Sequence, residues 1–372
     1  MNFEFADELL AVRDQARAFL AKQAPSASVR RVLDGEAPYD APTWKAVAEL
    51  GWLGAAIPEE LGGSGLGHEG LCVLAEEIGA AVAAIPFTSA CMAAEAIMLA
   101  GDAEHQRALL PKLAAGEAII CVALAEGPGN PASRAVKAQV RGGRLTGSKW
   151  PVADGGIADR AVVVARDAEG EIGLFLVDLA DPGATRTRLD SIDPTRDQAR
   201  LDFAGALAEP LPAARGWAAV EALLERTAVP VAFEQIGGAR TCLEMAKDFA
   251  MERHAFGRPI ASFQAVKHKL VDIYVANELA RSNAYYAAWA LQAEAPDLST
   301  AAAAARVSAT DAFHLASKEN IQVHGGMGFT WAADCHLYYR RSKLLALILG
   351  GAPWWKDRLV SRLEMVNADA EG

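Results

Sequence analysis

The sequence contains few cysteines, and none of them lies in a metal-binding arrangement. Its 372 residues include five cysteines, which are scattered and form no Cys-x-x-Cys pair. An odd and sparse set of cysteines fits a reducing compartment. The seven histidines show no H-E-x-x-H or similar ligand spacing. We therefore expect a protein without a metal site.

Long apolar runs and basic clusters are absent too. No uncharged apolar run reaches the length of a membrane span, which is about 20 residues. The N-terminus, MNFEFADELL, lacks the basic start and apolar run of a signal peptide. The net charge is −11, and no long block of Lys and Arg interrupts it. The sequence predicts a soluble cytoplasmic protein with no membrane span and no nucleic-acid partner.

Of two common enzyme motifs, one is missing and the other lacks the sequence context that it requires. The serine-nucleophile elbow G-x-S-x-G does not occur. The run from Gly65 to Gly70 matches the dinucleotide pattern G-x-G-x-x-G. No strand precedes this run, and no acidic residue follows it at the distance that a ribose requires. We interpret it as a turn before a helix.

What the sequence does contain is an order of helices, then strands, then helices. Up to about residue 116, helical spacing alternates with Pro and Gly turns. Short β-rich runs separated by turn residues follow, and they predict an antiparallel β domain: Ile119–Leu124, Arg160–Ala165, Ile172–Val177 and Ala199–Phe203. Helices and strands that are segregated in this way argue against an alternating βαβ sheet.

The last part of the chain is helical again. Gly216–Glu252 and Ser299–His324 have the spacing of long helices. Ser262 is a candidate N-cap for a helix between them. That helix has one apolar face, formed by Phe263, Val266, Leu270 and Ile273.

The segment Arg253–Lys269, RHAFGRPIASFQAVKHK, carries the most specific pattern in the chain. Arg253 offers a permanently charged, forked set of donors that suits a diphosphate. Phe256 offers an aromatic surface, and Gln264 offers both a donor and an acceptor. The segment also fits a simple turn between two helices.

A second motif, Gln322-Val-His-Gly-Gly-Met-Gly-Phe329, ends a helix in a glycine turn. Glycines allow backbone N–H groups to approach a phosphate closely. Together the two motifs resemble the acyl-CoA dehydrogenase family. The runs Gly51–Gly63 and Gly147–Lys149 also resemble landmarks of that family.

The resemblance covers nearly the whole chain and implies an α+β multidomain fold. It implies an N-terminal α-helical domain at 1–116, a middle antiparallel β-barrel at 117–212 and a C-terminal four-helix bundle at 213–372. It also implies FAD as cofactor, an acyl-CoA substrate and an electron-transferring flavoprotein as electron acceptor. Family members form tetramers in which a neighbouring subunit holds the adenosine end of each FAD. For that role it implies Arg253, Phe256, Gln264, Gln322, Gly325 and Gly326.

The family's catalytic base has no counterpart at either position where the family places it. Desaturation of an acyl-CoA thioester needs an ionised carboxylate to remove the α-proton. Counting from Gln322 places Leu349 at the family's glutamate, and counting back from Arg253 places Thr227 at the position used by a related subgroup. Neither side chain accepts a proton at neutral pH. Glu225 is the nearest carboxylate, but two residues along a helix is a rotation of about 200°.

The positions that the resemblance places beside the flavin ring differ as well. The family has Ser or Thr before the glutamate that ends the first strand, whereas this chain has Ala125 before Glu126. The family's Trp and Thr after the Gly-x-Lys turn are replaced by Pro151 and Ala153, and Trp150 lies one place out of register.

Residues that would serve a neighbour's FAD are thus present, whereas those that would serve the chain's own flavin and substrate are not. The sequence predicts a heterotetramer subunit that completes the FAD site of a catalytic acyl-CoA dehydrogenase chain, with a steroid side-chain or other bulky acyl-CoA as substrate. One alternative is a self-sufficient homotetramer with a relocated base, for which Glu225 is the first candidate. A non-catalytic FAD-binding or scaffold protein, and an oxidase or monooxygenase on the same fold, are the others.

Overall fold

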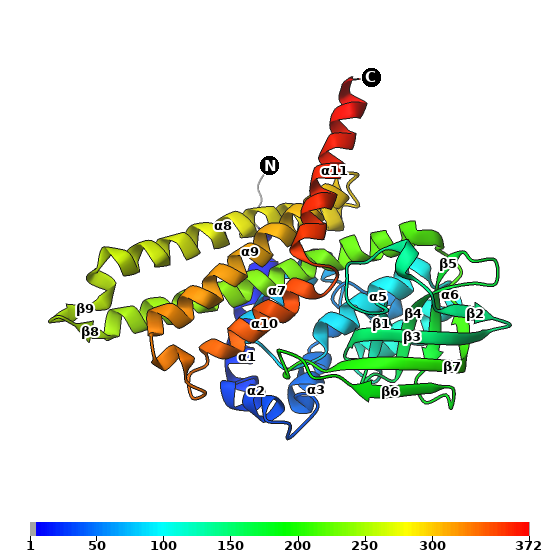
Figure 1. The fold of residues 1–372 in the computed structure, drawn as a ribbon, viewed down its shortest axis with the longest axis horizontal. Coiled ribbons are helices and arrows are strands. Elements are labelled where there is room, and N and C mark those ends of the chain that lie inside the picture. Colours follow the sequence, from blue (N-terminus) through cyan, green and yellow to red (C-terminus); the bar gives the residue numbers. More distant parts are fainter. Residues whose placement is uncertain (1–4, 372) are drawn as a thin grey trace. The chain divides into compact units, whose positions relative to one another are not determined.

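The computed structural model describes residues 5–371, with side chains described as far as residue 365. Helices come first, then the strands of one sheet, then helices again, as the sequence predicts (Figure 1). The helices before the sheet are α1 Asp7–Gln23, α2 Ser26–Leu33, α3 Ala41–Glu49, α4 Gly67–Ala80, α5 Phe87–Ala100 and α6 Ala103–Ala114. The helices after it are α7 Gly216–Glu252, α8 Gln264–Gln292, α9 Leu298–His324, α10 Cys335–Leu347 and α11 Ala352–Glu371.

The chain divides into two compact units that do not follow the order of the sequence. Unit 1 contains the residues up to Val29, Cys72–Ala83 and the chain from Ala228 onward. Unit 2 contains Arg30–Leu71 and Ala84–Thr227. Helices α2, α4 and α7 contribute to both units, because three of the unit boundaries fall inside these helices. The division into three sequential domains at residues 116 and 212 stays a prediction.

The sheet belongs to unit 2 and closes on itself. Its strands are β1 Ile120–Ala123, β2 Gln139–Arg141, β3 Arg144–Ala153, β4 Arg160–Arg166, β5 Ile172–Asp178, β6 Ala184–Arg188 and β7 Gln198–Pro210. The pairing order is β1-β4-β2-β3-β7-β5, β6 lies on β7, and the additional β4–β5 pairing completes the ring. Apolar side chains that are almost fully buried form its core, among them Leu145, Val162, Val164, Leu174, Val177 and Leu201.

The predicted strands are confirmed, but the sheet is not wholly antiparallel. Strand β4 pairs in parallel with β1 and, through Gln139 and Arg166, with β2. After β1 the chain forms the antiparallel β2–β3 pair. It then enters β4 running in the same direction as β1, so these two strands pair in parallel. Strands β2, β3 and β6 were not predicted, because β2 and β6 are short and charged, and β3 contains a proline and a glycine.

In unit 1, α4 and α7 cross with their backbones in contact. A Cβ atom on Gly79 would lie 1.9 Å from the carbonyl oxygen of Glu234, and one on Gly237 would lie 1.9 Å from that of Glu76. The next residue along α7, Gly238, faces the ring of Phe313 on α9 in the same way, with 2.4 Å to the nearest ring atom. Glycines therefore allow α7 to pack closely against a helix on each side.

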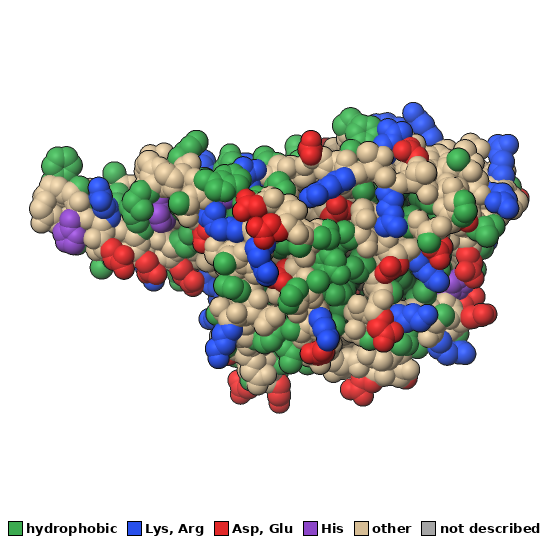
Figure 2. Space-filling model, turned by 90° about the horizontal axis from the view of Figure 1, so that it is seen from below, with side chains coloured by type: hydrophobic (Ala, Val, Ile, Leu, Met, Phe, Trp, Pro, Cys, Tyr) green, Lys and Arg blue, Asp and Glu red, His purple; other side chains and the backbone are tan. Residues whose placement is uncertain are grey.

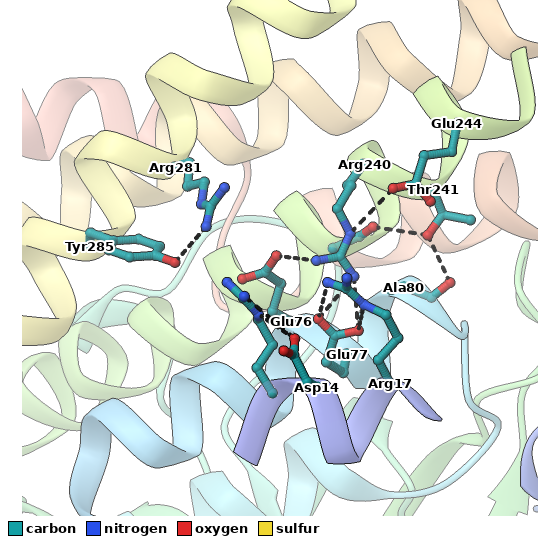
Figure 3. Close-up of polar contacts among 12 residues, drawn as sticks. Asp14, Arg17, Glu76, Glu77, Ala80, Arg240, Thr241, Glu244, Arg281 and Tyr285 are labelled. Carbon is teal, nitrogen blue, oxygen red and sulfur yellow. Dashed lines mark hydrogen bonds and ion pairs between the residues drawn. The ribbon is translucent and has the colours of Figure 1, made fainter. Parts of the chain in front are cut away.

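Buried ion pairs fix the crossing (Figure 3). Arg240 of α7 donates to Glu76 at 2.6 Å and to Glu77 at 2.9 Å, and Arg17 of α1 donates to Glu77 at 3.1 Å. Both carboxylates are almost fully buried. Burial raises the pKa of Glu76, against the opposing charge of Arg240. These pairs connect α1, α4 and α7, and removal of one partner would leave a buried charge unpaired.

We expect Gly237→Ala to lower the free energy of unfolding by about 2–4 kcal/mol, because the added methyl group overlaps the Glu76 carbonyl. Alanine otherwise favours a helix over glycine by about 1 kcal/mol. A loss of stability would therefore show that the steric overlap outweighs this preference. Urea denaturation followed by circular dichroism measures the change. Gly326→Ala is the control, because Gly326 has helical angles and open space around its Cβ position. A Gly237→Ala variant as stable as the wild type would show that the helices do not need this contact.

Candidate functional site

The Arg253 segment forms a short β-hairpin between α7 and α8. Strands β8 His254–Ala255 and β9 Arg258–Pro259 pair in antiparallel fashion. Phe256 and Gly257 form the two-residue turn with φ of 55° and 77°, and positive φ at both positions is what a type I′ turn requires. The turn places the ring of Phe256 in solvent, with 95% of the residue exposed. An exposed phenylalanine ring does not stabilise a turn, so the turn alone does not explain Phe256.

Aromatic contacts, and not the predicted serine cap, connect the hairpin to α8. The residue before α8 is Phe263, and no side chain caps the helix, so the predicted role of Ser262 is wrong. The Arg258 guanidinium lies 4.3 Å above the Phe263 ring, and Phe256 meets that ring edge-on at 6.2 Å. The Ser262 hydroxyl is buried beside the helix start and does not reach a backbone N–H. Gln264 is therefore the first residue of α8, and it is exposed.

The two sequence motifs come together at one end of unit 1. Phe249, one turn before Arg253, stacks on His324 with ring centroids 4.3 Å apart. Val323 packs with Ala246 and Ala250 of α7, and the partly buried side chains around them are Phe249, Ile260, Ala261, Val266 and Leu270. A motif at the end of α7 and a motif at the end of α9 thus share one apolar cluster.

All six residues that the resemblance assigns to FAD are exposed at this end: Arg253, Phe256, Gln264, Gln322, Gly325 and Gly326. A Cβ atom at Gly325 or Gly326 would meet no atom within 4 Å, so a ligand can approach that backbone. An exposed cation, an aromatic face, two amides and open backbone are groups that fit an adenosine and its diphosphate. Their role in binding FAD stays a prediction.

Leu349 lies in the turn between α10 and α11. Its φ is +61°, a left-handed conformation that costs a leucine about 1–2 kcal/mol. The fully buried Arg306 of α9 holds this turn by donating to the carbonyl oxygens of Leu345 and Ile348. Burial lowers the pKa of Arg306 to about 9. The turn is therefore well fixed, but the leucine at the position predicted for the base cannot accept a proton.

Thr227, the second base position, is buried in α7. It is 1% exposed, and its hydroxyl donates to the carbonyl oxygen of Leu223 at 2.8 Å. Glu225 is partly exposed on the same helix. Thr227 is thus used within its own helix, and Glu225 points in a different direction from it by about 200°.

A buried polar cluster that the sequence did not predict lies in unit 2. His68 of α4 contacts Glu95 of α5 at 2.5 Å, and Arg226 of α7 donates to the other oxygen of Glu95 at 2.7 Å. Burial opposes the ionisation of Glu95, but the hydrogen bond from His68 and the charges of His68 and Arg226 hold its pKa below the ordinary value. The three residues are far apart in sequence, so no motif could have revealed the cluster. It connects three helices of unit 2.

The positions predicted beside the flavin ring are occupied by structural contacts. The fully buried Lys149 donates to Glu126 at 2.7 Å and to the carbonyl oxygen of Leu124 at 3.1 Å. The backbone N–H of Trp150 donates to the carbonyl oxygen of Ala125 at 2.8 Å. The side chains of Ala125, Pro151 and Ala153 contain no hydrogen-bond donor. The residues present therefore fit the adenosine end of FAD better than its ring.

Three further observations concern membrane spans, metal sites and cysteines in the described part of the chain. No helix within residues 5–371 is both long enough and apolar enough to cross a membrane. The same residues contain no cluster of three or more His, Cys, Asp or Glu side chains that could hold a metal ion. All five cysteines are free and buried.

Both ends of the chain match models of one family. Residues 6–117 match the acyl-CoA dehydrogenase N-terminal domain, and residues 214–353 match the acyl-CoA dehydrogenase C-terminal domain. Acyl-CoA dehydrogenase IpdE2 of Mycobacterium tuberculosis is 33% identical over 92% of this chain and 93% of its own length. The human mitochondrial short-chain specific acyl-CoA dehydrogenase is 29% identical over 86% of this chain and 81% of its own.

Two solved structures have folds similar to that of this chain. A variant of the Tcur3481-Tcur3483 steroid ACAD has a chain that is 32% identical, with a TM-score of 0.88 over 97% of this chain and 99% of that one. The ChsE4-ChsE5 complex of Mycobacterium tuberculosis has a chain that is 28% identical, with a TM-score of 0.89 over 98% of this chain and 99% of that one.

We expect Glu95→Gln to destabilise the protein by about 3 kcal/mol near neutral pH, because it leaves Arg226 beside an uncharged buried partner. The folded state lowers the pKa of Glu95 below its ordinary value of 4.5. Its carboxylate therefore contributes stability above pH 4.5 and loses that contribution as the pH falls through the lowered pKa. Urea denaturation at a series of pH values should show the difference from wild type shrinking on acidification. The exposed Glu49, changed to Gln, should show no such difference; a pH-independent effect of Glu95→Gln would contradict the ion-pair interpretation.

Proposed function

The chain belongs to the acyl-CoA dehydrogenase family of FAD-dependent oxidoreductases, which act on CH–CH bonds, and from this premise we propose that it is the partner subunit of a heterotetramer. In that role it completes the FAD site of a catalytic chain and does not itself remove the substrate proton. The proposal is supported by a contrast within one chain: the residues that the resemblance assigns to the adenosine are exposed, whereas the position that it assigns to the base is a leucine, Leu349.

In the assembly, the end of unit 1 would hold the part of FAD that does no chemistry. Arg253 would pair with the diphosphate, since a guanidinium donates to two oxygens at once. Phe256 would lie against the adenine, and the exposed Gln264 and Gln322 would donate to and accept from its edges. When bound, the flavin would accept the hydride. The protein would contribute by binding and orienting the cofactor.

Proton removal would fall to a carboxylate of the partner chain. Leu349 has no proton acceptor, although Arg306 keeps its turn in a defined conformation. Thr227 donates its hydroxyl to its own helix. Neither residue can hold or move the α-proton, and a general base must lie within hydrogen-bond distance of the proton it removes.

The relatives suggest the remaining partners. Similarity to a steroid ACAD supports a CoA thioester with a steroid side chain or another bulky acyl group as substrate. The family's usual electron acceptor, an electron-transferring flavoprotein, would reoxidise the flavin. Five free, buried cysteines are consistent with the cytoplasm as the place of action.

Co-expression with a second chain tests the proposal directly. The second chain should be the glutamate-bearing family member encoded nearest to this one. We expect a stable complex with about one FAD for each pair of unlike chains, measured from flavin absorbance after gel filtration, and turnover of acyl-CoA by that complex. Steroid-side-chain and short-chain thioesters should be assayed in parallel. If this chain alone retains a full complement of FAD and desaturates acyl-CoA, it is a self-sufficient enzyme and the proposal is wrong.

Glu225→Gln separates this proposal from a homotetramer with a relocated base. We expect the activity of the complex to change by less than about twofold, because loss of a general base costs about 10²- to 10⁴-fold. Glu221→Gln, one turn earlier on α7, is the matched control. Steady-state turnover with saturating acyl-CoA is the measurement. A loss of more than about a hundredfold for Glu225→Gln alone would identify Glu225 as the base.

A further inference from the structure

We propose that the interior of unit 1 contains a conformational device in which two buried arginines couple the turn that ends α4 to the turn that carries Leu349. A change in the conformation of one turn then loosens the other. The buried relay, as we name it, consists of Val82, Arg341, Glu234, Gln235, Arg306 and Ile348. It does not depend on the proposed function.

The first end of the buried relay is the turn that ends α4, residues 78–83. Val82 has a φ of +42° there, although it is β-branched and glycine is the usual residue at such a position. The backbone N–H of Ala83 donates to the carbonyl oxygen of Ile78 at 3.1 Å, the hydrogen bond that closes helices of this kind. The chain leaves unit 1 after Ala83. A strained residue thus lies where the chain passes from one unit to the other.

Side chains of α10 and α7 hold the α4 turn from inside unit 1. Arg341 of α10 donates to the carbonyl oxygen of Val82 at 3.4 Å and to the carboxylate of Glu234 at 3.1 Å. The carbonyl oxygen of Ala80 accepts a hydrogen bond from Thr241 of α7 at 3.1 Å (Figure 3). The left-handed conformation of Val82 therefore depends on contacts from two other helices.

The second end of the buried relay is the Leu349 turn, residues 346–351. Leu349 is also left-handed without being glycine, with a φ of +61°. Arg306 of α9 donates to the carbonyl oxygens of Leu345 and Ile348, which come just before it. The same guanidinium donates to the side chain of Gln235 at 2.5 Å. Each strained turn is thus held by a buried arginine that donates to its backbone.

The two ends meet at consecutive residues of α7. Glu234 binds Arg341, and the next residue, Gln235, binds Arg306, so a shift of this part of α7 changes the contacts of both arginines. Burial lowers the pKa of Arg306 to about 9, and the charge of Glu234 opposes that lowering. One carboxylate thus acts on both guanidinium groups.

The buried relay is closed off from water. Many charged side chains lie on the surface of the chain, as Figure 2 shows for one face. In contrast, Arg306, Arg341 and Glu234 are at most 1% exposed, and Gln235 is fully buried. A buried charge that loses its partner is costly, because no water replaces the lost hydrogen bond. The members of such a network rearrange together, which is the physical basis of the coupling.

Hydrogen exchange of the full-length chain, followed by mass spectrometry, tests the coupling. Arg341→Lys keeps the charge but loses the fork that holds Glu234 and Val82 together. We expect the amides of the α4 turn to exchange about thirtyfold faster, the size of a lost hydrogen bond to a charged group. Those of the Leu349 turn should exchange at least about fivefold faster through the coupling. Arg306→Lys should show the reverse pattern, with the larger effect at the Leu349 turn.

Arg240→Lys is the matched control. Arg240 also joins α7 to α4, but it does so through Glu76 and Glu77, which lie outside the buried relay. It should speed exchange in α4 and leave the Leu349 turn within about twofold of wild type. Wild type in enough urea to match the global stability of each variant separates local opening from global unfolding. The proposal is wrong if the distant turn changes by less than about twofold in both relay variants, or if Arg240→Lys or urea alone reproduces the effect.

A second pair of variants keeps the test open if an arginine variant does not fold. Val82→Gly and Leu349→Gly each introduce a residue that adopts the left-handed conformation freely, and they leave every side chain that donates or accepts in the buried relay in place. Urea denaturation gives the unfolding constant of each variant. We expect the double variant to depart by about fivefold or more from the product of the two single effects. Agreement within about twofold would mean that the two turns are independent and would overturn the proposal.

Discussion

The fold of unit 1 depends on the close crossing of α4 and α7 at two glycines. At Gly79 and Gly237 each helix lies against a carbonyl oxygen of the other, at a distance that no larger residue can occupy. Because the backbones are so close, the partly buried Arg240 reaches both of the buried carboxylates, Glu76 and Glu77. Steric fit permits this crossing, and the ion pairs then select one register among those that the apolar surfaces would allow.

Helix α7 connects this crossing to the end of unit 1 where we place the cofactor. Arg253 follows Gly237 by 16 residues, or about 24 Å of helix. On the other side of α7, Gly238 receives Phe313 of α9, and α9 ends at His324 against Phe249. The adenosine-end residues therefore sit on a packed frame of helices. Arg306 fixes the turn at Leu349 in a similar way, by donating to the carbonyl oxygens of Leu345 and Ile348.

The order of elements could be predicted, because it depends on local patterns, whereas the ligand role of the two motifs stays a prediction. Helical spacing located α7 to the residue, and Phe-Gly marked a turn before α8, although the β8–β9 hairpin that forms there was not predicted. The strands β2 and β6 could not be found, because their charged residues give no apolar alternation. The cluster of His68, Glu95 and Arg226 was equally hidden, since it depends on the packing of three separate helices. Arg306 is a lone arginine that follows a run of alanines in a predicted helix, and this context is the sequence signal that indicates a buried role for it.

The central claim is that this chain holds the adenosine end of an FAD whose ring belongs to another subunit. A cryo-electron microscopy map of the co-expressed complex, with acyl-CoA bound, tests it most directly. The account predicts adenosine density against Arg253, Phe256 and Gly325 of this chain, continuous with a flavin ring inside the glutamate-bearing chain. A flavin ring beside Ala125 and Pro151 of this chain, with acyl-CoA next to Leu349, would contradict it.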